Sequence, residues 1–229
     1  MMDNVRRPTA TPQPPAAQQV PPAERGQAEQ PAASPADPPV SYDPPRAHGP
    51  WQIKSSRTAY HDPWLSVRRD EVIRPDGLDS SYAIVRIKPG ICVIAIDEQG
   101  QVHLTEEFHY AVGRTTIEGV SGGIELGDTA TETAHRELIE ELGITAEQLH
   151  SFGTTDAFSA SIDSPTALFV ATGLTFGQAQ PEATELIGHV TMPLADAVQG
   201  VMSGVITHSP TCILLLRLAL DERLGQFRK

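Results

Sequence analysis

The sequence predicts a mixed α/β protein, either α/β or α+β, in which helices cover a β-sheet. Three observations predict this class. Short β-rich runs separated by turn residues dominate residues 51–120, a strongly patterned helix follows at residues 129–142, and further strand and helix patterns occupy the C-terminal third. Strands and helices mixed in this order are typical of layered sandwiches. The sequence shows no internal repeat.

The N-terminal segment differs in composition from the rest of the chain. Of the 20 prolines, 13 lie in residues 1–50, among Ala, Gln and Ser. Such a segment has too little large apolar surface to offset the entropy lost on ordering. We therefore predict a disordered Pro/Ala/Gln-rich tail at residues 1–48, an N-terminal strand region at 49–88 and a main domain at 89–229. The tail is either a flexible extension without a specific role or a docking segment.

The first elements after the tail are predicted to be strands. The runs WLSVRRDEVIR and SYAIVRI flank the turn signal PDG, a pattern that predicts a hairpin. ICVIAID is a strongly apolar strand, DEQGQ a turn and VHLTEEF an alternating strand. TTIEGV then leads into the glycine pair Gly122–Gly123.

The clearest helix signal follows the glycine pair. Thr129 and Glu132 have the spacing of a capping box, and Asp128 precedes them where the helix dipole favours a negative charge. A buried stripe recurs every fourth residue, and Gly143 stands where a left-handed cap ends a helix. The stripe consists of Ala130, Ala134, Leu138 and Leu142. Further along, TALFVAT and ELIGHVTM are predicted strands, and LADAVQGVMSG and PTCILLLRLALDERLG are predicted helices that cover a sheet.

Composition excludes several classes of function. The formal net charge of −12 argues against a nucleic-acid surface, which needs a basic face. No apolar run approaches the length needed to span a bilayer, and the N-terminus carries no apolar signal segment. Cys92 and Cys212 both lie in apolar runs, which indicates core residues in a reducing compartment. We expect a cytoplasmic protein without nucleic-acid or membrane partners.

The segment RELIEELG, residues 136–143, concentrates negative charge on one helix face. Glu137 lies one turn from both Glu140 and Glu141. Like charges at this spacing are unfavourable unless a cation gathers them, and hard divalent ions prefer oxygen ligands. From these residues alone, a metal site and a solvated charged face are equally compatible with the pattern.

The wider string GGIELGDTATETAHRELIEELGI resembles the Nudix box. That motif runs glycine, five residues, an acid, seven residues, then Arg-Glu-apolar-any-Glu-Glu-any-Gly-apolar. The matching positions are Gly122, Arg136, Glu137, Leu138, Glu140, Glu141, Gly143 and Ile144. The one departure is Asp128, where the family has glutamate. Because this position supports the arrangement from the start of the helix, we expect the shorter side chain to tune activity without abolishing it.

The resemblance implies a Nudix α/β/α sandwich with a mixed sheet, preceded by extra N-terminal strands. It also implies hydrolysis of a nucleoside diphosphate linked to another moiety. The implied Mg²⁺ site, in which Mn²⁺ is a possible substitute, is oriented by Arg136 through an ion pair. Its ligands are Glu137, Glu140, Glu141 and the backbone around Gly122. The ions make a bound water acidic enough to attack phosphorus.

A carboxylate must remove the proton from the attacking water. The resemblance leaves two kinds of candidate open. One is Glu141 on the helix, and the other is a glutamate of a later loop, matched by Glu185 with Glu182 as the neighbouring alternative.

Beyond the box, residues 57–220 resemble the ADP-ribose pyrophosphatase group and its nucleotide-sugar relatives. That group commonly dimerises by exchanging N-terminal strands, so the resemblance implies a homodimer. It also implies a substrate-contacting glutamate ahead of the box glycine, matched by Glu118. Arg114 and His109 are further candidates for substrate binding, although an inert surface position is as compatible with either.

Three departures affect the substrate side. The family's Glu-Leu-Pro-Ala-Gly is EGVSG here, His109 replaces a frequent arginine, and FSASIDSP replaces a Ser-Pro-Gly turn. Trp51, Trp64 and Tyr82 either stack on a base or, as aromatic residues in strands more often do, belong to the core. His208 is assigned no partner.

The predicted activity is Mg²⁺-dependent hydrolysis of ADP-ribose or a related nucleoside diphosphate sugar to a nucleoside monophosphate and a sugar phosphate. A nucleoside triphosphate or dinucleoside polyphosphate is the alternative substrate. A non-catalytic Nudix sensor is the alternative class of protein. Such modules usually lose box glutamates, and their retention here favours catalysis.

Overall fold

The computed structural model describes residues 38–181 and 186–221. Within these ranges the chain forms two sheets and three helices. The first sheet has the order β1-β2-β3-β4-β10. Its strands are β1 (Val40–His48), β2 (Trp51–His61), β3 (Leu65–Ile73), β4 (Asp79–Ile87) and β10 (Ile162–Asp163).

The predicted hairpin is confirmed by β3 and β4. The two strands pair antiparallel from Leu65↔Ile87 to Ile73↔Asp79, and the Arg74 amide donates to the Leu78 carbonyl across the turn. The short strand β10 pairs parallel with β4 and brings the segment before β11 onto this sheet.

The predicted limit of the disordered tail is wrong for residues 40–48. These residues form β1, which pairs antiparallel with β2. Composition misled the prediction because Pro44 and Pro45, which cannot donate to a ladder, lie in the register shift between Ser41 and Arg46, while the residues on either side pair with β2. Residues 1–37 lie outside the described residues, and their disorder stays a prediction.

The second sheet has the order β12-β6-β5-β11-β9, with β7 paired to β6 and β8 paired to β5. It is mixed, because β5 and β11 run parallel while the other pairs are antiparallel. The bounds are β5 (Gly90–Ile96), β6 (Gln101–His109), β7 (Arg114–Glu118), β8 (Val120–Gly123), β9 (Ile144–Asp156), β11 (Pro165–Phe176) and β12 (Gly188–Pro193).

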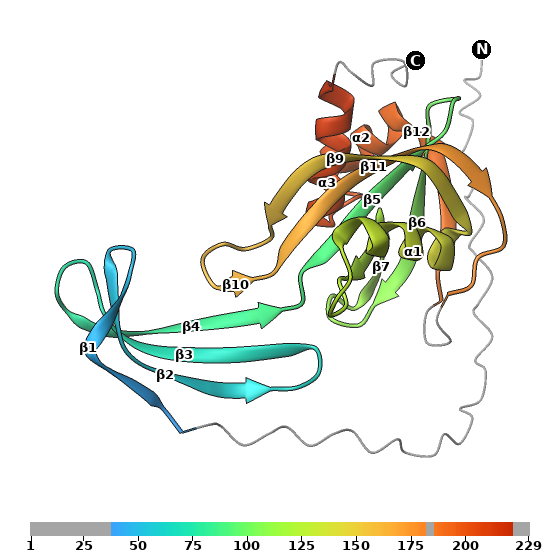
Figure 1. Cartoon of the computed structure of the whole chain (residues 1–229). Helices are drawn as coiled ribbons and strands as arrows, with labels where there is room; N and C mark the ends of the chain where they lie inside the picture. The colour runs from blue at the N-terminus through green and yellow to red at the C-terminus, as the bar shows by residue number, and fades with distance from the viewer. Residues whose placement is uncertain (1–37, 182–185, 222–229) are drawn as a thin grey trace, which may run out of the picture. The chain divides into compact units, whose positions relative to one another are not determined.

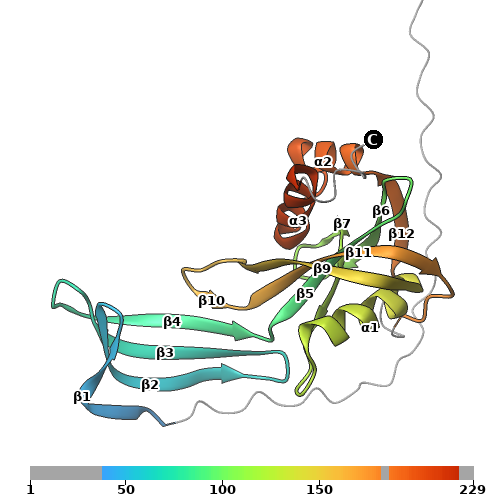
Figure 2. The same ribbon diagram turned by 45° about the horizontal axis from the view of Figure 1, so that its top comes forward.

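Helices cover both faces of the second sheet, as Figures 1 and 2 show. The helix α1 (Ala130–Leu142) covers one face, and α2 (Leu194–Ser203) with α3 (Ser209–Leu220) covers the other. The central strand β5 is buried on both sides: Cys92, Ile94 and Ile96 pack in the core of α2 and α3, while alternate residues pack against α1. This arrangement confirms the predicted α/β/α sandwich. No helix in the described ranges has the length and apolar character needed to cross a membrane.

The ends of α1 confirm the helix prediction. The Thr129 side chain accepts a hydrogen bond from the Glu132 amide, and the Glu132 carboxylate accepts one from the Thr129 amide. At the other end Gly143 adopts the left-handed conformation with φ of 65°. Ala134 and Leu138 are buried against the sheet. These contacts set the rotation of α1 about its axis and so decide which way the box glutamates point.

Candidate active site

A cavity of about 560 Å³ opens beside the N-terminal end of β5. One part of its wall comes from β8 and α1, and another comes from the strand region at residues 64–91. The lining residues that carry the argument below are Trp64, Lys88, Gly122, Arg136, Glu137, Glu140 and His208. Gly122, Glu137 and Glu140 of the predicted metal site therefore share a cavity with residues of the N-terminal strand region.

Gly122 on β8 and Glu137 on α1 are in direct contact. A Cβ atom built on Gly122 would lie 2.1 Å from Oε1 of Glu137, far inside the contact limit of two heavy atoms. With the Glu137 side chain in this conformation only glycine fits, and the carboxylate consequently lies against bare backbone. The predicted approach of the Gly122 backbone to the metal stays a prediction, and the structure places that backbone beside the Glu137 carboxylate.

Arg136 holds two of the box glutamates with separate nitrogens. Its Nη2 lies 2.9 Å from Glu137 Oε1, and its Nη1 lies 2.8 Å from Glu140 Oε2. Burial alone lowers the pKa of Arg136, but the two carboxylates raise it overall, so the guanidinium stays charged. The orienting role that the resemblance implied for Arg136 therefore has a geometric basis.

The donor set fits a divalent cation by its chemistry. Glu137 and Glu140 present hard oxygen ligands to the cavity beside a glycine backbone, and this is the ligand type that such ions prefer. In the described part of the chain, no three His, Cys, Asp or Glu side chains already converge as a metal centre. Glu141 is not among the residues that line the cavity. Its roles as ligand and base stay predictions.

Cys92 lies behind the site and is inert. Burial raises the pKa of its thiol to about 12, although hydrogen bonds to Thr211 and Ser121 act in the opposite direction. The negative charges of Glu118 and Glu141 raise this pKa further. The thiol is therefore uncharged at neutral pH, as the prediction of a core cysteine requires.

Glu118, at the end of β7, is surrounded by protein donors. Its Oε1 accepts from Thr116 Oγ1 at 2.6 Å and lies 3.1 Å from His109 Nε2. Its Oε2 lies 3.2 Å from His208 Nδ1. His208 in turn lies 2.8 Å from Thr211 Oγ1, which also accepts the Gly119 amide at 2.8 Å. The structure thus gives His208 the partners that sequence reasoning did not find.

Other predicted residues lie elsewhere or outside the described ranges. Arg114 donates to Thr207 Oγ1 at 2.7 Å and does not line the cavity. Asp128 is exposed in the loop before α1, where its amide donates to the Glu125 carbonyl. Glu185 and Glu182, the candidates for the later catalytic loop, lie outside the described residues.

Trp64 and Lys88 line the cavity, Trp64 as one of the two alternatives that the sequence left open and Lys88 as a residue that sequence reasoning did not name. The preference of strand aromatics for the core is wrong for Trp64, which is 69% exposed at the cavity. Lys88 lies 2.8 Å and 3.0 Å from the two Glu125 oxygens and brings a positive charge to the rim. The sequence signal for the exposure of Trp64 was the Asp-Pro pair directly before it. This pair follows the end of β2, so that Trp64 lies in the turn between β2 and β3.

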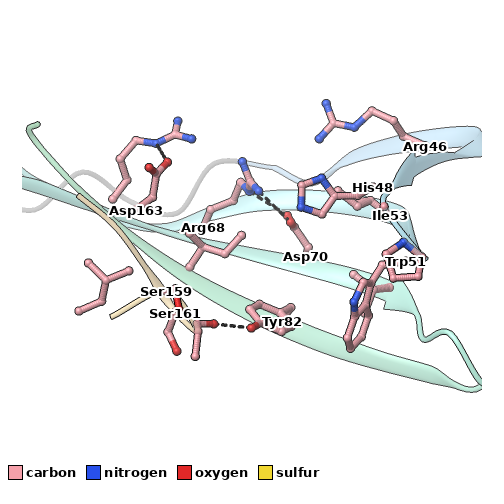
Figure 3. Close-up of a pocket in the computed structure, with 17 residues that line it drawn as sticks. Arg46, His48, Trp51, Ile53, Arg68, Asp70, Tyr82, Ser159, Ser161 and Asp163 are labelled. Carbon is pink, nitrogen blue, oxygen red and sulfur yellow. Dashed lines mark hydrogen bonds and ion pairs between the residues drawn. The ribbon is translucent and has the colours of Figure 1, made fainter. Parts of the chain in front are cut away.

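A second cavity of about 690 Å³ lies on the first sheet and contains no residue of the box (Figure 3). Trp51 and Tyr82 meet edge to face in its wall, with ring centroids 5.7 Å apart, and Tyr82 donates to the Ala160 carbonyl. Arg68 donates two hydrogen bonds of 3.1 Å, from Nε and Nη2, to the two oxygens of the buried Asp70 carboxylate. Because its aromatic rings and Asp70 already have partners within the protein, we assign the chemistry to the first cavity.

The α/β/α sandwich carries a glutamate-rich helix and a glycine-containing strand that line one cavity, an arrangement compatible with metal-assisted hydrolysis. Comparison with known proteins gives the family. A model of the NUDIX domain matches residues 86–204, and one of the nucleoside diphosphate sugar hydrolase N-terminal domain matches residues 51–85. The chain belongs to the NUDIX family and is a pyrophosphohydrolase. Nudix hydrolases generally use a divalent metal.

Several relatives cover most of the described chain. The methanol dehydrogenase activator of Bacillus methanolicus is 31% identical over 165 residues, 70% of this chain and 88% of the relative. The ADP-ribose pyrophosphatases of Mycobacterium tuberculosis and Bacillus subtilis are 28% and 29% identical, each over 68% of this chain and over 76% and 85% of their own lengths. The crystal structure of an ADP compounds hydrolase superposes with a TM-score of 0.67 at 20% identity, over 77% of this chain and 96% of that one. That likeness supports the fold.

Proposed function

We propose that the protein hydrolyses the diphosphate bond of ADP-ribose or a related nucleoside diphosphate sugar, with Mg²⁺, to a nucleoside monophosphate and a sugar phosphate. The observation that carries the proposal is the shared cavity. Glu137 and Glu140 of the box line it together with Trp64 and Lys88 of the N-terminal strand region. The ADP-ribose pyrophosphatases among the relatives support the choice of ADP-ribose.

One part of the cavity wall carries the proposed metal ligands. Glu137 and Glu140 would hold the metal, with Glu141 and the Gly122 backbone as the remaining ligands. Arg136 orients the first two carboxylates through its two ion pairs. When bound, Mg²⁺ would offset the charge of the diphosphate and make the attacking water more acidic.

The other wall of the cavity binds the organic parts of the substrate. Trp64 offers an exposed indole face on which a base stacks. Lys88 supplies a positive charge at the rim. The sequence-based candidates His109, Arg114 and Glu118 do not themselves line this cavity. Glu141 is our first candidate for the base that takes the proton of the attacking water, and Glu185 is the second.

We also propose a cytoplasmic homodimer that acts on small molecules. The net charge of −12 supports a small-molecule substrate over nucleic acid. The thiols of Cys92 and Cys212 are free in the structure, which supports a reducing compartment. Among the described residues β1 is the outer strand of the first sheet, and its outer edge would serve for pairing with a second copy.

The test is a substrate panel on the full-length protein with excess Mg²⁺ and an EDTA control. It contains ADP-ribose, UDP-glucose, GDP-mannose, diadenosine polyphosphates and a nucleoside triphosphate, with products separated by anion-exchange chromatography. We expect AMP and ribose 5-phosphate from ADP-ribose, or the matching pair from one nucleotide sugar. Turnover confined to triphosphates or dinucleoside polyphosphates would contradict the proposed substrate and assign one of these classes instead. Tight nucleotide binding without turnover would favour a non-catalytic sensor.

A further inference from the structure

The Glu118 carboxylate is largely buried and is surrounded by hydrogen-bonding groups of the protein. Its side chain is 13% exposed and does not line the active-site cavity, and both of its oxygens already accept hydrogen bonds or face an imidazole. A carboxylate placed in this way has little freedom to contact a substrate directly. Glu118 and its partners Thr116, His109 and His208 form a hydrogen-bonded network, and of these His208 lines the cavity.

The contact with Glu118 favours one tautomer of His208. Nδ1 lies 3.2 Å from Glu118 Oε2, and an ionised carboxylate can only accept hydrogen bonds, so this contact is satisfied when Nδ1 carries the proton. Thr211 Oγ1, at 2.8 Å, lies close enough to share that proton. With the proton on Nδ1, a neutral imidazole has a bare lone pair on Nε2. In the described part of the chain, Nε2 has no hydrogen-bond partner.

The anchoring of the network is rigid. Thr211 is fully buried on α3 and accepts the amide of Gly119, the residue after Glu118. A Cβ atom on Gly119 would lie 2.8 Å from the Val93 carbonyl, so this turn is pressed onto β5. The start of α3 and the end of β7 are therefore locked together, and the His208 ring is held between them.

We propose that His208 contacts the substrate through Nε2, as the acceptor for a hydroxyl group of the sugar, and that Glu118 positions His208. A lone pair on nitrogen selects a donor, and at neutral pH the donors of a nucleotide sugar are its hydroxyl and amino groups, whereas its phosphate oxygens are acceptors. This inference rests on the proposed function and replaces the direct substrate contact that the resemblance implied for Glu118.

The neutral state of His208 agrees with its surroundings. Burial lowers its pKa, the charge of Glu118 opposes that effect, and nearby His109 lowers the pKa further. The charged or titratable side chains around the ring are Glu118 and His109 from β7 and β6. Arg114 on β7 also lies close by, bonded to Thr207 at the preceding position.

The test is a double-mutant cycle on the full-length protein, read as the Kd for α,β-methylene ADP-ribose, which cannot be hydrolysed. In His208→Asn the amide nitrogen replaces Nδ1 toward Glu118, while the Nε2 acceptor is lost. Asparagine is also favoured at the N-cap of α3, which His208 occupies. We expect a roughly five- to tenfold weaker Kd, the usual cost of one neutral hydrogen bond.

Glu118→Gln should weaken binding as much as His208→Asn, and the double variant should be no weaker than either single variant. The matched control is His150→Asn on β9, whose ring contacts Thr172 away from the cavity. Additive losses in the double variant would show that Glu118 contacts the ligand itself and would overturn the inference. So would an unchanged Kd in His208→Asn.

A second measurement needs no ligand. The ¹⁵N shifts of the His208 ring should show the Nδ1–H tautomer in the wild type and a loss of that preference in Glu118→Gln. An Nε2–H tautomer in the wild type would overturn the inference even if the enzyme hydrolyses ADP-ribose. If ADP-ribose is neither bound nor hydrolysed, the proposed substrate fails, and the cycle is repeated with an analogue of the nucleotide sugar that the panel identifies.

Discussion

Gly122 and Glu137 lie so close that no side chain fits between them, because a Cβ on Gly122 would lie 2.1 Å from the glutamate oxygen. Gly122 is on β8 and Glu137 is on α1, and they are fifteen positions apart in the sequence. The contact joins the strand and the helix that carry the predicted metal ligands. Any atom added at Gly122 must therefore displace the carboxylate or move the strand.

Gly122→Ala should reduce kcat/KM about 100-fold, since a displacement of about 1 Å at a reacting centre costs that much. The matched control is Gly123→Ala at the next position, where an added Cβ would meet only Lys88 carbons at 3.6 Å and 3.9 Å. Steady-state kinetics with ADP-ribose and thermal unfolding by circular dichroism distinguish the two. Equal activity in both variants would mean that the Glu137 carboxylate is not needed where the structure places it.

Arg136→Lys should weaken metal binding. Lysine carries one ammonium group and cannot place two nitrogens on Glu137 and Glu140 at once, as the guanidinium does. We expect Mn²⁺ affinity, measured by electron paramagnetic resonance, to fall roughly 10- to 100-fold, the usual loss when an outer partner of a metal ligand is removed. Arg69→Lys, at an exposed pair with Glu71, is the control. Wild-type affinity in Arg136→Lys would argue against the orienting role.

Glu141→Gln should lower kcat about 10²- to 10⁴-fold while the fold stays intact, because the amide neither holds a cation as a carboxylate does nor accepts the proton of water. Glu98→Gln, in the exposed turn between β5 and β6, is the control. Folding is checked by circular dichroism and turnover by product chromatography. Full activity in folded Glu141→Gln would remove Glu141 from both of its assigned roles and leave Glu185 as the candidate base.

The box could be predicted from sequence because its signals are local. The capping residues, the buried stripe and Gly143 all act within one helix, and the structure confirms each of them on α1. The resemblance implied that Gly122 and Glu137 serve the same metal site, but it did not predict their direct contact. Its physical cause, the absence of room for a Cβ, needed the packed strand and helix.

The features that the sequence did not predict depend on contacts between residues far apart in the chain. His208 meets Glu118 across ninety positions, and no local pattern marks such a pair. The strand β9 (Ile144–Asp156) was not predicted, because its exposed and buried residues do not alternate regularly and its order comes from pairing with β11. The strand β1 was hidden by its prolines, whereas its backbone pairs with β2 on both sides of a register shift.

Asp128→Glu, which restores the residue of the Nudix pattern, should change kcat/KM by less than about threefold, the range of surface substitutions that touch nothing else. Asp128 is exposed, and the hydrogen bond recorded for it is made by its backbone amide. A large gain in activity would show that the shorter side chain limits the enzyme. The comparison uses the same metal concentration for both proteins.

Acidification should destabilise the fold through His208. Burial is the largest cause that lowers its pKa below 6.5, with Glu118 opposing and His109 reinforcing the shift. The unfolded chain then binds a proton at a higher pH than the folded chain does, so the free energy of unfolding falls as pH drops through about 6.5. This contribution is fully present above that pH and is lost toward the folded pKa.

Chemical denaturation at several pH values between about 7.5 and 5.5 measures the slope, over the interval in which an ordinary histidine titrates. His208→Asn cannot titrate, and its free energy of unfolding should fall less steeply over this interval than that of the wild type. The same slope in His208→Asn and the wild type would mean that the ring is protonated equally in the folded and unfolded chains, and that the network with Glu118 does not exclude the proton.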